Sequence, residues 1–234
     1  MIVFVFRLWY KIKYACMGII FWLNNLKGLF MGKYITPVAM LDKCLVKNGV
    51  DDKIRQKIVG HGENVKITNK PEIIAEACFN IMTVMDELLD EKTKKKVRED
   101  CACCLGGEQN KKCREVNKKY ESPEERIKAI NETNSGFGYG YKIIEKGRYE
   151  ITFYDESSPY YKKCVCLGMR LNSINKKWSK TWCYCCGGHV KHHLQTILGK
   201  KVKVKILSSA LTSMGKRGCH FELKEIYYGD NNAI

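Results

Sequence analysis

Two near-copies of a cysteine cluster carry the residues of this chain that are best suited to chemistry. They are Cys101-Ala-Cys103-Cys104-Leu-Gly-Gly and Cys183-Tyr-Cys185-Cys186-Gly-Gly. Zinc and iron–sulfur centres need up to four thiolates that converge on one point. Further thiols lie outside the two clusters, at Cys113, Cys164, Cys166 and Cys219. The sequence therefore predicts a zinc or an iron–sulfur site, and the spacing does not choose between the two.

The clusters could build one composite site or two separate ones. A composite site would take two or three cysteines from each cluster. Cys113 lies about 13 Å beyond Cys104 if the intervening residues are helical, so it joins a shared site only if residues 101–107 fold back. The Gly-Gly pair after each cluster is expected to let the backbone turn sharply and direct N–H groups toward sulfur.

Cys185 and Cys186 also support nucleophilic chemistry. We expect a helix to begin just after them, and a helix N-terminus lowers the pKa of a thiol. Such a thiolate would serve equally as a metal ligand or as a nucleophile. Two other interpretations stay open, thiol–disulfide exchange and burial as small apolar side chains. We adopt burial for three isolated cysteines, Cys16, Cys44 and Cys78.

Two histidines on the helix expected after the second cluster are further candidates. His189 and His193 are four residues apart and share a helix face, a spacing that metal-binding helices use. No glutamate accompanies them in His-Glu-x-x-His order. We expect them to be solvated or to lie behind the ligands rather than to bind the metal.

Composition bounds the class of protein. The 234 residues include 13 cysteines, and the formal net charge is +16. Closely spaced cysteines suit metal ligation in a reducing cytoplasm better than a secreted disulfide scaffold. The positive charge comes mainly from lysines spread over the chain, so we do not expect a nucleic-acid partner.

Residues 1–30 differ from the rest of the chain. They contain no acidic residue and include an apolar stretch from Tyr14 to Leu26 that is shorter than the roughly 20 residues of a membrane span. We interpret them as a translated leader that is not native protein, with a basic membrane-surface segment or a short anchor as alternatives. A membrane partner is expected only if these residues are native.

Residues 31–133 form a helical region in this interpretation. Apolar periodicity predicts helices over residues 38–48, 51–59 and from Pro71 onward, and it leaves open whether the last of these continues through residues 91–100. Ser122-Pro-Glu-Glu125 is a capping box that predicts a helix to about Glu132.

Residues 134–234 form an α/β region with the second cluster. Alternation predicts strands over residues 137–143, 149–153, 201–207 and 218–226, with a helix over residues 188–198. The fold class that we expect is α+β, a helical N-terminal half followed by a four-stranded, mostly antiparallel sheet with a packed helix.

The order of features from Gly187 to Phe221 resembles the closing segment of the 4-vinyl-reductase domain. These features are a helix that ends at Leu198-Gly199, an alternating strand, and Gly215-Lys-Arg-Gly218-Cys219-His-Phe221. The resemblance implies a small-ligand-binding module, but that family brings no cluster like Cys183-Tyr-Cys185-Cys186, so its ligand does not carry over. A weaker likeness links the chain to hydrolases of L-2-amino-thiazoline-4-carboxylate, for which no catalytic residues match.

The leading hypothesis is a cytoplasmic, cysteine-rich metal-binding protein with a sensor-like small-ligand domain, from a bacterial or archaeal family without an assigned activity. The alternative is a thiolate-dependent enzyme, either a hydrolase or a thiol redox protein. No Ser/His/Asp order, phosphate loop or dinucleotide fingerprint indicates a named reaction. The partners that we consider are a small molecule and a second copy of the chain in a homodimer.

Overall fold

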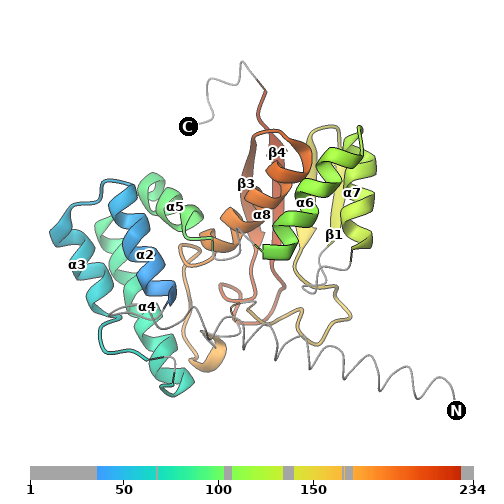
Figure 1. Cartoon of the computed structure of the whole chain (residues 1–234). Helices are drawn as coiled ribbons and strands as arrows, with labels where there is room; N and C mark the ends of the chain where they lie inside the picture. The colour runs from blue at the N-terminus through green and yellow to red at the C-terminus, as the bar shows by residue number, and fades with distance from the viewer. Residues whose placement is uncertain are drawn as a thin grey trace, which may run out of the picture.

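The computed structural model describes residues 36–66, 68–102, 107–133, 140–164, 166 and 171–227. Within these residues the chain is α+β, as predicted: helices dominate the first half, and a four-stranded antiparallel sheet with a packed helix forms the second (Figure 1). The residues of three predictions, those on residues 1–30, on Cys16, and on Cys103 and Cys104, lie outside the described residues.

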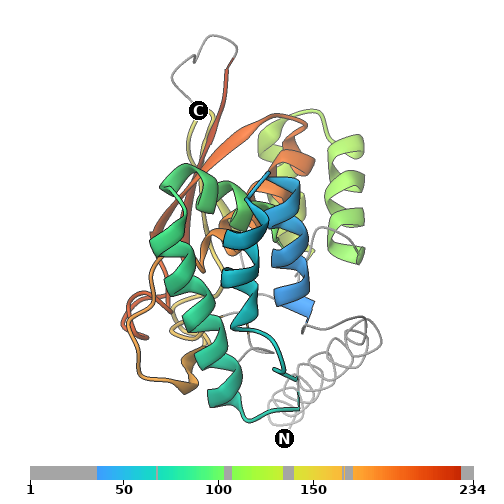
Figure 2. The same ribbon diagram turned by 90° about the vertical axis from the view of Figure 1, so that its left-hand side faces the viewer.

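Four helices form the first part: α2 (Thr36–Lys47), α3 (Asp52–Gly60), α4 (Pro71–Leu88) and α5 (Glu91–Asp100). Asp51 caps α3 by accepting hydrogen bonds from the backbone N–H groups of Lys53 and Ile54. The stretch that could have prolonged α4 is a separate helix, because Leu89 is extended and Asp90 caps α5. Figure 2 shows these helices grouped in front of the sheet.

Two helices follow, α6 (Gly107–Lys119) and α7 (Pro123–Glu132). The predicted capping box of α7 is confirmed: the Ser122 hydroxyl accepts from the Glu125 backbone N–H, and the Glu125 carboxylate accepts from the Ser122 backbone N–H. The capped start of α7, which depends on local sequence alone, was therefore predicted correctly.

The sheet contains β1 (Gly140–Glu145), β2 (Arg148–Thr152), β3 (Val202–Ser208) and β4 (His220–Glu225) in the order β1-β2-β4-β3. All neighbouring strands are antiparallel. Tyr149, Leu223 and Val204 stand opposite one another and are buried. The alternate residues point away from this face, so the sheet has one buried and one solvated face.

Helix α8 (Tyr184–Leu198) packs on the buried face of the sheet together with α6 and α7. It begins four residues earlier than the sequence predicted, so the second cysteine cluster occupies its first turn. A left-handed Gly199 ends it, as expected. The short 3₁₀ helix η2 (Leu171–Ser173) lies against α4.

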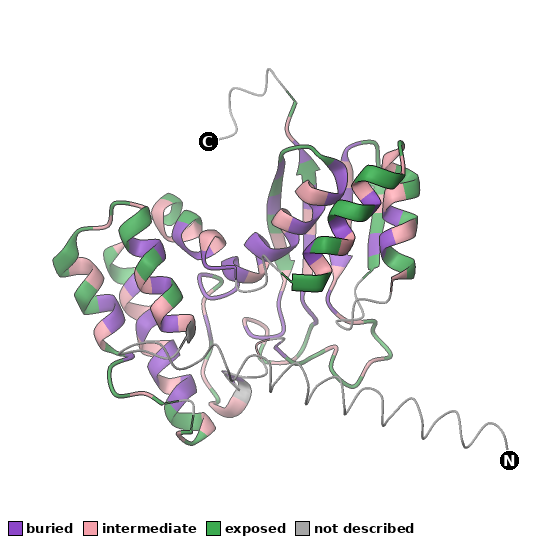
Figure 3. Ribbon diagram, viewed as in Figure 1, coloured by how far each residue is buried: buried purple, intermediate pink, exposed green. Residues whose placement is uncertain are grey.

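Two hydrophobic clusters build the core. One lies among α2–α5 and extends to Leu171, Trp178 and Trp182; the other fills the space between the sheet and α6–α8. The buried segments of α5 and the start of α8 meet between them (Figure 3). Among the residues described, no helix has the length and apolar character needed to cross a membrane.

Candidate functional site

The end of α5 and the start of α8 approach each other without room for a side chain. A Cβ atom added to Gly188 would lie 2.1 Å from the carbonyl oxygen of Glu99. This contact brings Cys101, the C-cap residue of α5, against the first turn of α8, where the Cys185 thiol donates a hydrogen bond of 3.6 Å to the Cys101 carbonyl. Cys101 of the first cluster and the start of the second cluster, distant in sequence, therefore meet in one place.

Polar contacts hold this junction in register. Thr181 Oγ1 donates to Asp86 Oδ1 at 2.6 Å, which ties the residues before α8 to α4. Lys191 Nζ lies 2.7 Å from Glu99 Oε2 and ties α8 to α5. The Tyr184 hydroxyl donates to Glu91, at the other end of α5. The first turn of α8 is thus fixed from both sides.

Arg98 lies at the centre of the junction and is only 3% exposed. Its Nη2 atom donates to the Trp182 carbonyl at 3.0 Å, and its guanidinium lies 4.4 Å from the centre of the Trp182 ring. Its Nε atom has no hydrogen-bond partner, and no carboxylate of the described residues forms an ion pair with it. A buried charge in a protein normally has a partner of opposite charge.

Among the sulfurs around Arg98, Cys166 can supply that partner, because it is the one whose pKa is held low. Burial alone lowers the pKa of Arg98, but Coulombic interaction with the surrounding cysteines outweighs this effect and raises it. The thiols responsible are those of Cys101, Cys185, Cys166 and Cys186. We refer to Arg98 with these four cysteines and Cys164 as the Arg98 thiol centre.

Cys166 is the cysteine of this centre whose pKa is lowered. Hydrogen bonding with Cys164 and Cys186 lowers it most, and the charge of the Arg98 guanidinium and hydrogen bonding with Trp182 act in the same direction. These interactions hold the pKa of Cys166 well below that of an ordinary cysteine, although burial opposes them. The other two cysteines respond in the opposite sense: hydrogen bonding with Cys166, together with burial, raises the pKa values of Cys164 and Cys186 well above the ordinary value.

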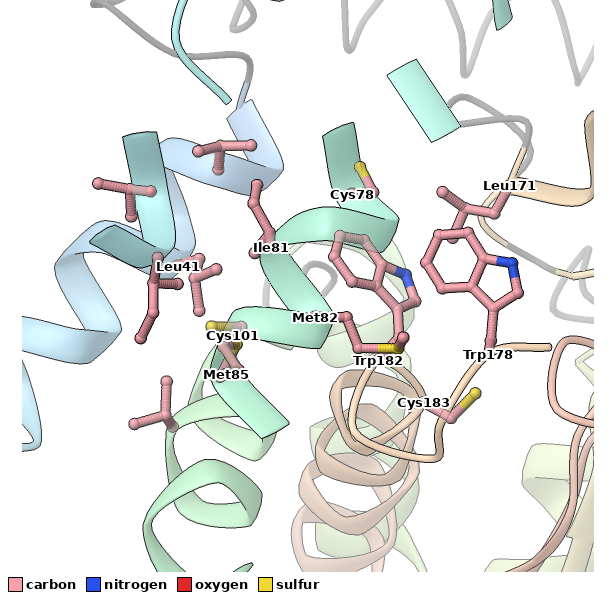
Figure 4. Packing of buried hydrophobic residues seen from close by; sticks show 14 of the residues in the cluster. Leu41, Cys78, Ile81, Met82, Met85, Cys101, Leu171, Trp178, Trp182 and Cys183 are labelled. Atoms are coloured by element: carbon pink, nitrogen blue, oxygen red, sulfur yellow. The ribbon is translucent and has the colours of Figure 1, made fainter. Parts of the chain in front are cut away.

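The other two predicted ligands of this region have different surroundings. The Cys183 thiol donates to Ser209 Oγ at 3.2 Å, and burial raises its pKa to about 12. In the close view, Cys183 lies apart from Cys101, with the indole of Trp182 between their positions (Figure 4). Cys219 accepts from the Ala210 backbone N–H at 3.4 Å, and burial raises its pKa to about 11.

The first cluster contributes Cys101 to the centre. Cys113, in contrast, lies on α6 in the core between the sheet and its helices, where burial raises its pKa to about 11. Cys78 is buried on α4, as expected, with a pKa raised to about 12 by burial. Cys44 is also buried but is not isolated, because hydrogen bonding with Cys101 lowers its pKa.

The structure bears on two expectations about local structure. His189 and His193 are buried, so of the two alternatives for these histidines the solvated one is wrong; their rings lie 4.3 Å apart, and burial lowers the pKa of His189 to about 4. Gly187 and Gly188 do not form a sharp turn, because both lie inside α8, where the missing side chain of Gly188 admits α5.

The described residues do not form a ligand arrangement that would support the predicted zinc or iron–sulfur site. Within the described part of the chain, no three His, Cys, Asp or Glu side chains converge in an arrangement that could hold a metal ion. What converges instead is a set of thiols around a guanidinium, in which hydrogen bonding lowers the pKa of one sulfur.

Arg98 and Trp182 are the functional candidates that the sequence interpretation missed. Arg98 precedes Cys101 by three residues on a helix, so the two share a face, and Trp182 directly precedes the second cluster. Both signals can be recognised in the local sequence. The role of the two residues also depends on the contact between the end of α5 and the start of α8, which the local sequence does not indicate.

A family model described as a family of unknown function, DUF6144, matches residues 38–227. This range includes every residue of the Arg98 thiol centre. No curated protein and no solved structure matches the chain in the corresponding comparisons. Because the match spans most of its length, the chain belongs to the DUF6144 family.

Proposed function

We propose that the chain is a thiol–disulfide redox protein, with Cys166 as the nucleophile and Cys186 as the resolving thiol. The observation that carries this proposal is the hydrogen-bond pattern at Cys166, which accepts from two thiols beside a buried guanidinium. Thiol–disulfide exchange requires a thiolate, and neighbouring cations and hydrogen-bond donors make a thiolate available at neutral pH.

The chemistry balances with a low-molecular-weight disulfide as co-reactant. The Cys166 thiolate attacks one sulfur of that disulfide, whose S–S bond breaks and releases one thiolate. Cys186 then loses its proton to the medium and attacks Cys166 Sγ, which releases the second thiolate. Two protein thiols are oxidised to one disulfide, and the co-reactant is reduced to two thiols.

Cys186 is assigned as the resolving thiol because of its place in the first turn of α8. The positive end of the helix dipole stabilises the thiolate that this second step requires. Cys164 also donates to Cys166 but has no helix N-terminus behind it. Its role in the proposal is to hold the Cys166 thiolate by hydrogen bonding.

The test is disulfide mapping after the full chain reacts with oxidised glutathione. We expect a disulfide-linked peptide that joins Cys166 to Cys186. The variant Cys186→Ser should instead accumulate a mixed disulfide at Cys166, while the matched control Cys164→Ser should still close the bond. Absence of any modification at Cys166 in the folded wild-type chain would refute the proposal.

Metal binding is the second candidate function, with zinc or an iron–sulfur cluster as the metal. It is supported by the convergence of thiols from three separate segments around one buried cation, since an iron–sulfur cluster with four thiolates carries net negative charge that Arg98 would offset. Metal analysis and a visible spectrum of anaerobically purified protein test it. Bound iron with sulfide, or stoichiometric zinc, with Cys166 protected from alkylation, would favour this candidate over the first.

We further propose a small-ligand-binding role for the α/β part, as the resemblance to the 4-vinyl-reductase domain implies. Its support is the succession of α8, Gly199, β3, Gly215 and β4, which agrees with the quoted pattern. A reducing cytoplasm is the compartment that we propose, because all cysteines of the described residues are free thiols.

A further inference from the structure

A further pair of cysteines, which includes Cys101 of the Arg98 thiol centre, lies between α2 and α5. Cys44 belongs to the buried face of α2, and Cys101 ends α5; each is 4% exposed. The two side chains interact: hydrogen bonding between them lowers the pKa of Cys44 and raises that of Cys101. The two sulfur atoms are therefore neighbours, although 57 positions separate the residues in the sequence.

The backbones that carry the two cysteines are held together by a polar clamp. The side-chain amide of Asn48 donates to the Cys44 carbonyl at 2.8 Å and to Asp100 Oδ2 at 3.0 Å. Lys47 Nζ lies 3.0 Å from the same carboxylate oxygen. The clamp joins residues adjacent to both cysteines, so the closeness of the sulfurs is built into the packing of α2 on α5.

The surroundings of the pair separate it from an ordinary buried cysteine. Both cysteines belong to the apolar core of the helical part together with Val97, Leu41 and Met85, the last two of which lie near Cys101 in the close view (Figure 4). Hydrogen bonding with Cys101 lowers the pKa of Cys44, whereas Cys78 in the same core has its pKa raised by burial. Lys47 is exposed and Asn48 half-buried, so the pair lies one layer beneath the surface.

We propose that Cys44 and Cys101 form a second redox site, an intrachain disulfide that links α2 to α5. The Cys44 thiolate attacks a low-molecular-weight disulfide and releases one thiolate. Cys101 then gives up its proton to the medium and attacks Cys44 Sγ, which releases the second thiolate. The protein loses two thiols and gains one S–S bond, while the co-reactant is reduced to two thiols.

The experiment equilibrates the full chain with glutathione thiol/disulfide buffers, quenches it with acid, alkylates the free thiols and maps the disulfides. We expect a peptide that joins Cys44 to Cys101, with both thiols lost together. The variant Cys44→Ser should remove this species, and the control Cys78→Ala should leave it unchanged. In Cys166→Ser the pair should still form, which separates this proposal from the function proposed above.

A measurement on the wild-type chain alone does not depend on the folding of any variant. Because a cross-link over a long loop restricts the unfolded chain, the form with the Cys44–Cys101 bond should unfold at a higher urea concentration than the reduced form. The proposal is overturned if both residues stay thiols in buffers that oxidise Cys166, if Cys101 pairs with Cys185 instead, or if a bound metal holds both sulfurs.

Discussion

Arg98 carries a permanent positive charge at a place that water barely reaches. Its neighbours in the described chain are thiols and an indole, not carboxylates, and this explains why one of the thiols is held as an acceptor. Sequence alone identified the cysteines as the chemical groups but not the arginine. Its charge partner Cys166 comes from a segment distant in sequence, and no local pattern indicates such a contact.

The indole of Trp182 gives a prediction at the same scale. Trp182→Phe keeps an aromatic ring over Arg98 but removes the N–H that donates to Cys166, so the pKa of Cys166 should rise. At the pH where wild-type alkylation is half-maximal, the alkylation rate of Cys166 should fall roughly two- to tenfold. Trp178→Phe is the matched control, because the Trp178 indole N–H is buried without a partner. Equal profiles for the two variants would argue against the Trp182 hydrogen bond.

At the scale of elements, the helices and strands that carry strong local signals were predicted well. The capping box of α7 and the alternation of β3 are examples in which neighbouring residues determine the structure. The start of α8 was predicted too late because its N-cap, Cys183, makes no side-chain cap hydrogen bond and resembles no standard cap residue. The packing of α5 on α8 places Cys101 of the first cluster against the first turn of α8. Apolar periodicity along the sequence does not predict which helices pack together.

Adjacent glycines of α8 test that packing. Gly188→Ala would put a methyl group onto the Glu99 backbone and should lower the free energy of unfolding by roughly 3 kcal/mol. Gly187→Ala would meet only Val204, at 3.5 Å, and should be neutral or stabilising by up to about 1 kcal/mol because alanine favours a helix. Urea denaturation of both variants under reducing conditions provides the measurement. Similar losses for both would mean that α5 and α8 do not approach at Gly188.

At the scale of the whole molecule, the helical part and the α/β part both contribute residues to the Arg98 thiol centre at their junction. Cys101 of the first cluster contacts Cys185 of the second, whereas Cys113 lies in the other core; the composite metal site itself stays a prediction. The thiols therefore differ in protonation. Most are buried with raised pKa values and stay protonated, whereas the pKa of Cys166, near Arg98, is lowered. Composition predicted the number of thiols but not this division.

The buried thiols give the stability of the whole chain a pH dependence. Burial raises the pKa values of Cys78 and Cys183 to about 12 and those of Cys113 and Cys219 to about 11, from an ordinary 9.0. Above pH 9.0 the unfolded chain releases these protons and the folded chain does not, so the free energy of unfolding should fall as the pH rises toward 11. Each thiol contributes up to about 1.4 kcal/mol per pH unit in this window. Urea denaturation at several pH values under reducing conditions checks this, and a stability unchanged above pH 9.0 would show that the four thiols are not buried.

The most direct test of the account is the pH dependence of Cys166 alkylation in the folded wild-type chain, followed by peptide mass spectrometry. If Arg98, Trp182 and the two donor thiols hold Cys166 as a thiolate, its alkylation rate should already be at its plateau at neutral pH and fall only at lower pH. Arg98→Met should move this profile upward. A wild-type profile with its midpoint at the ordinary cysteine value of 9.0 would contradict the central claim.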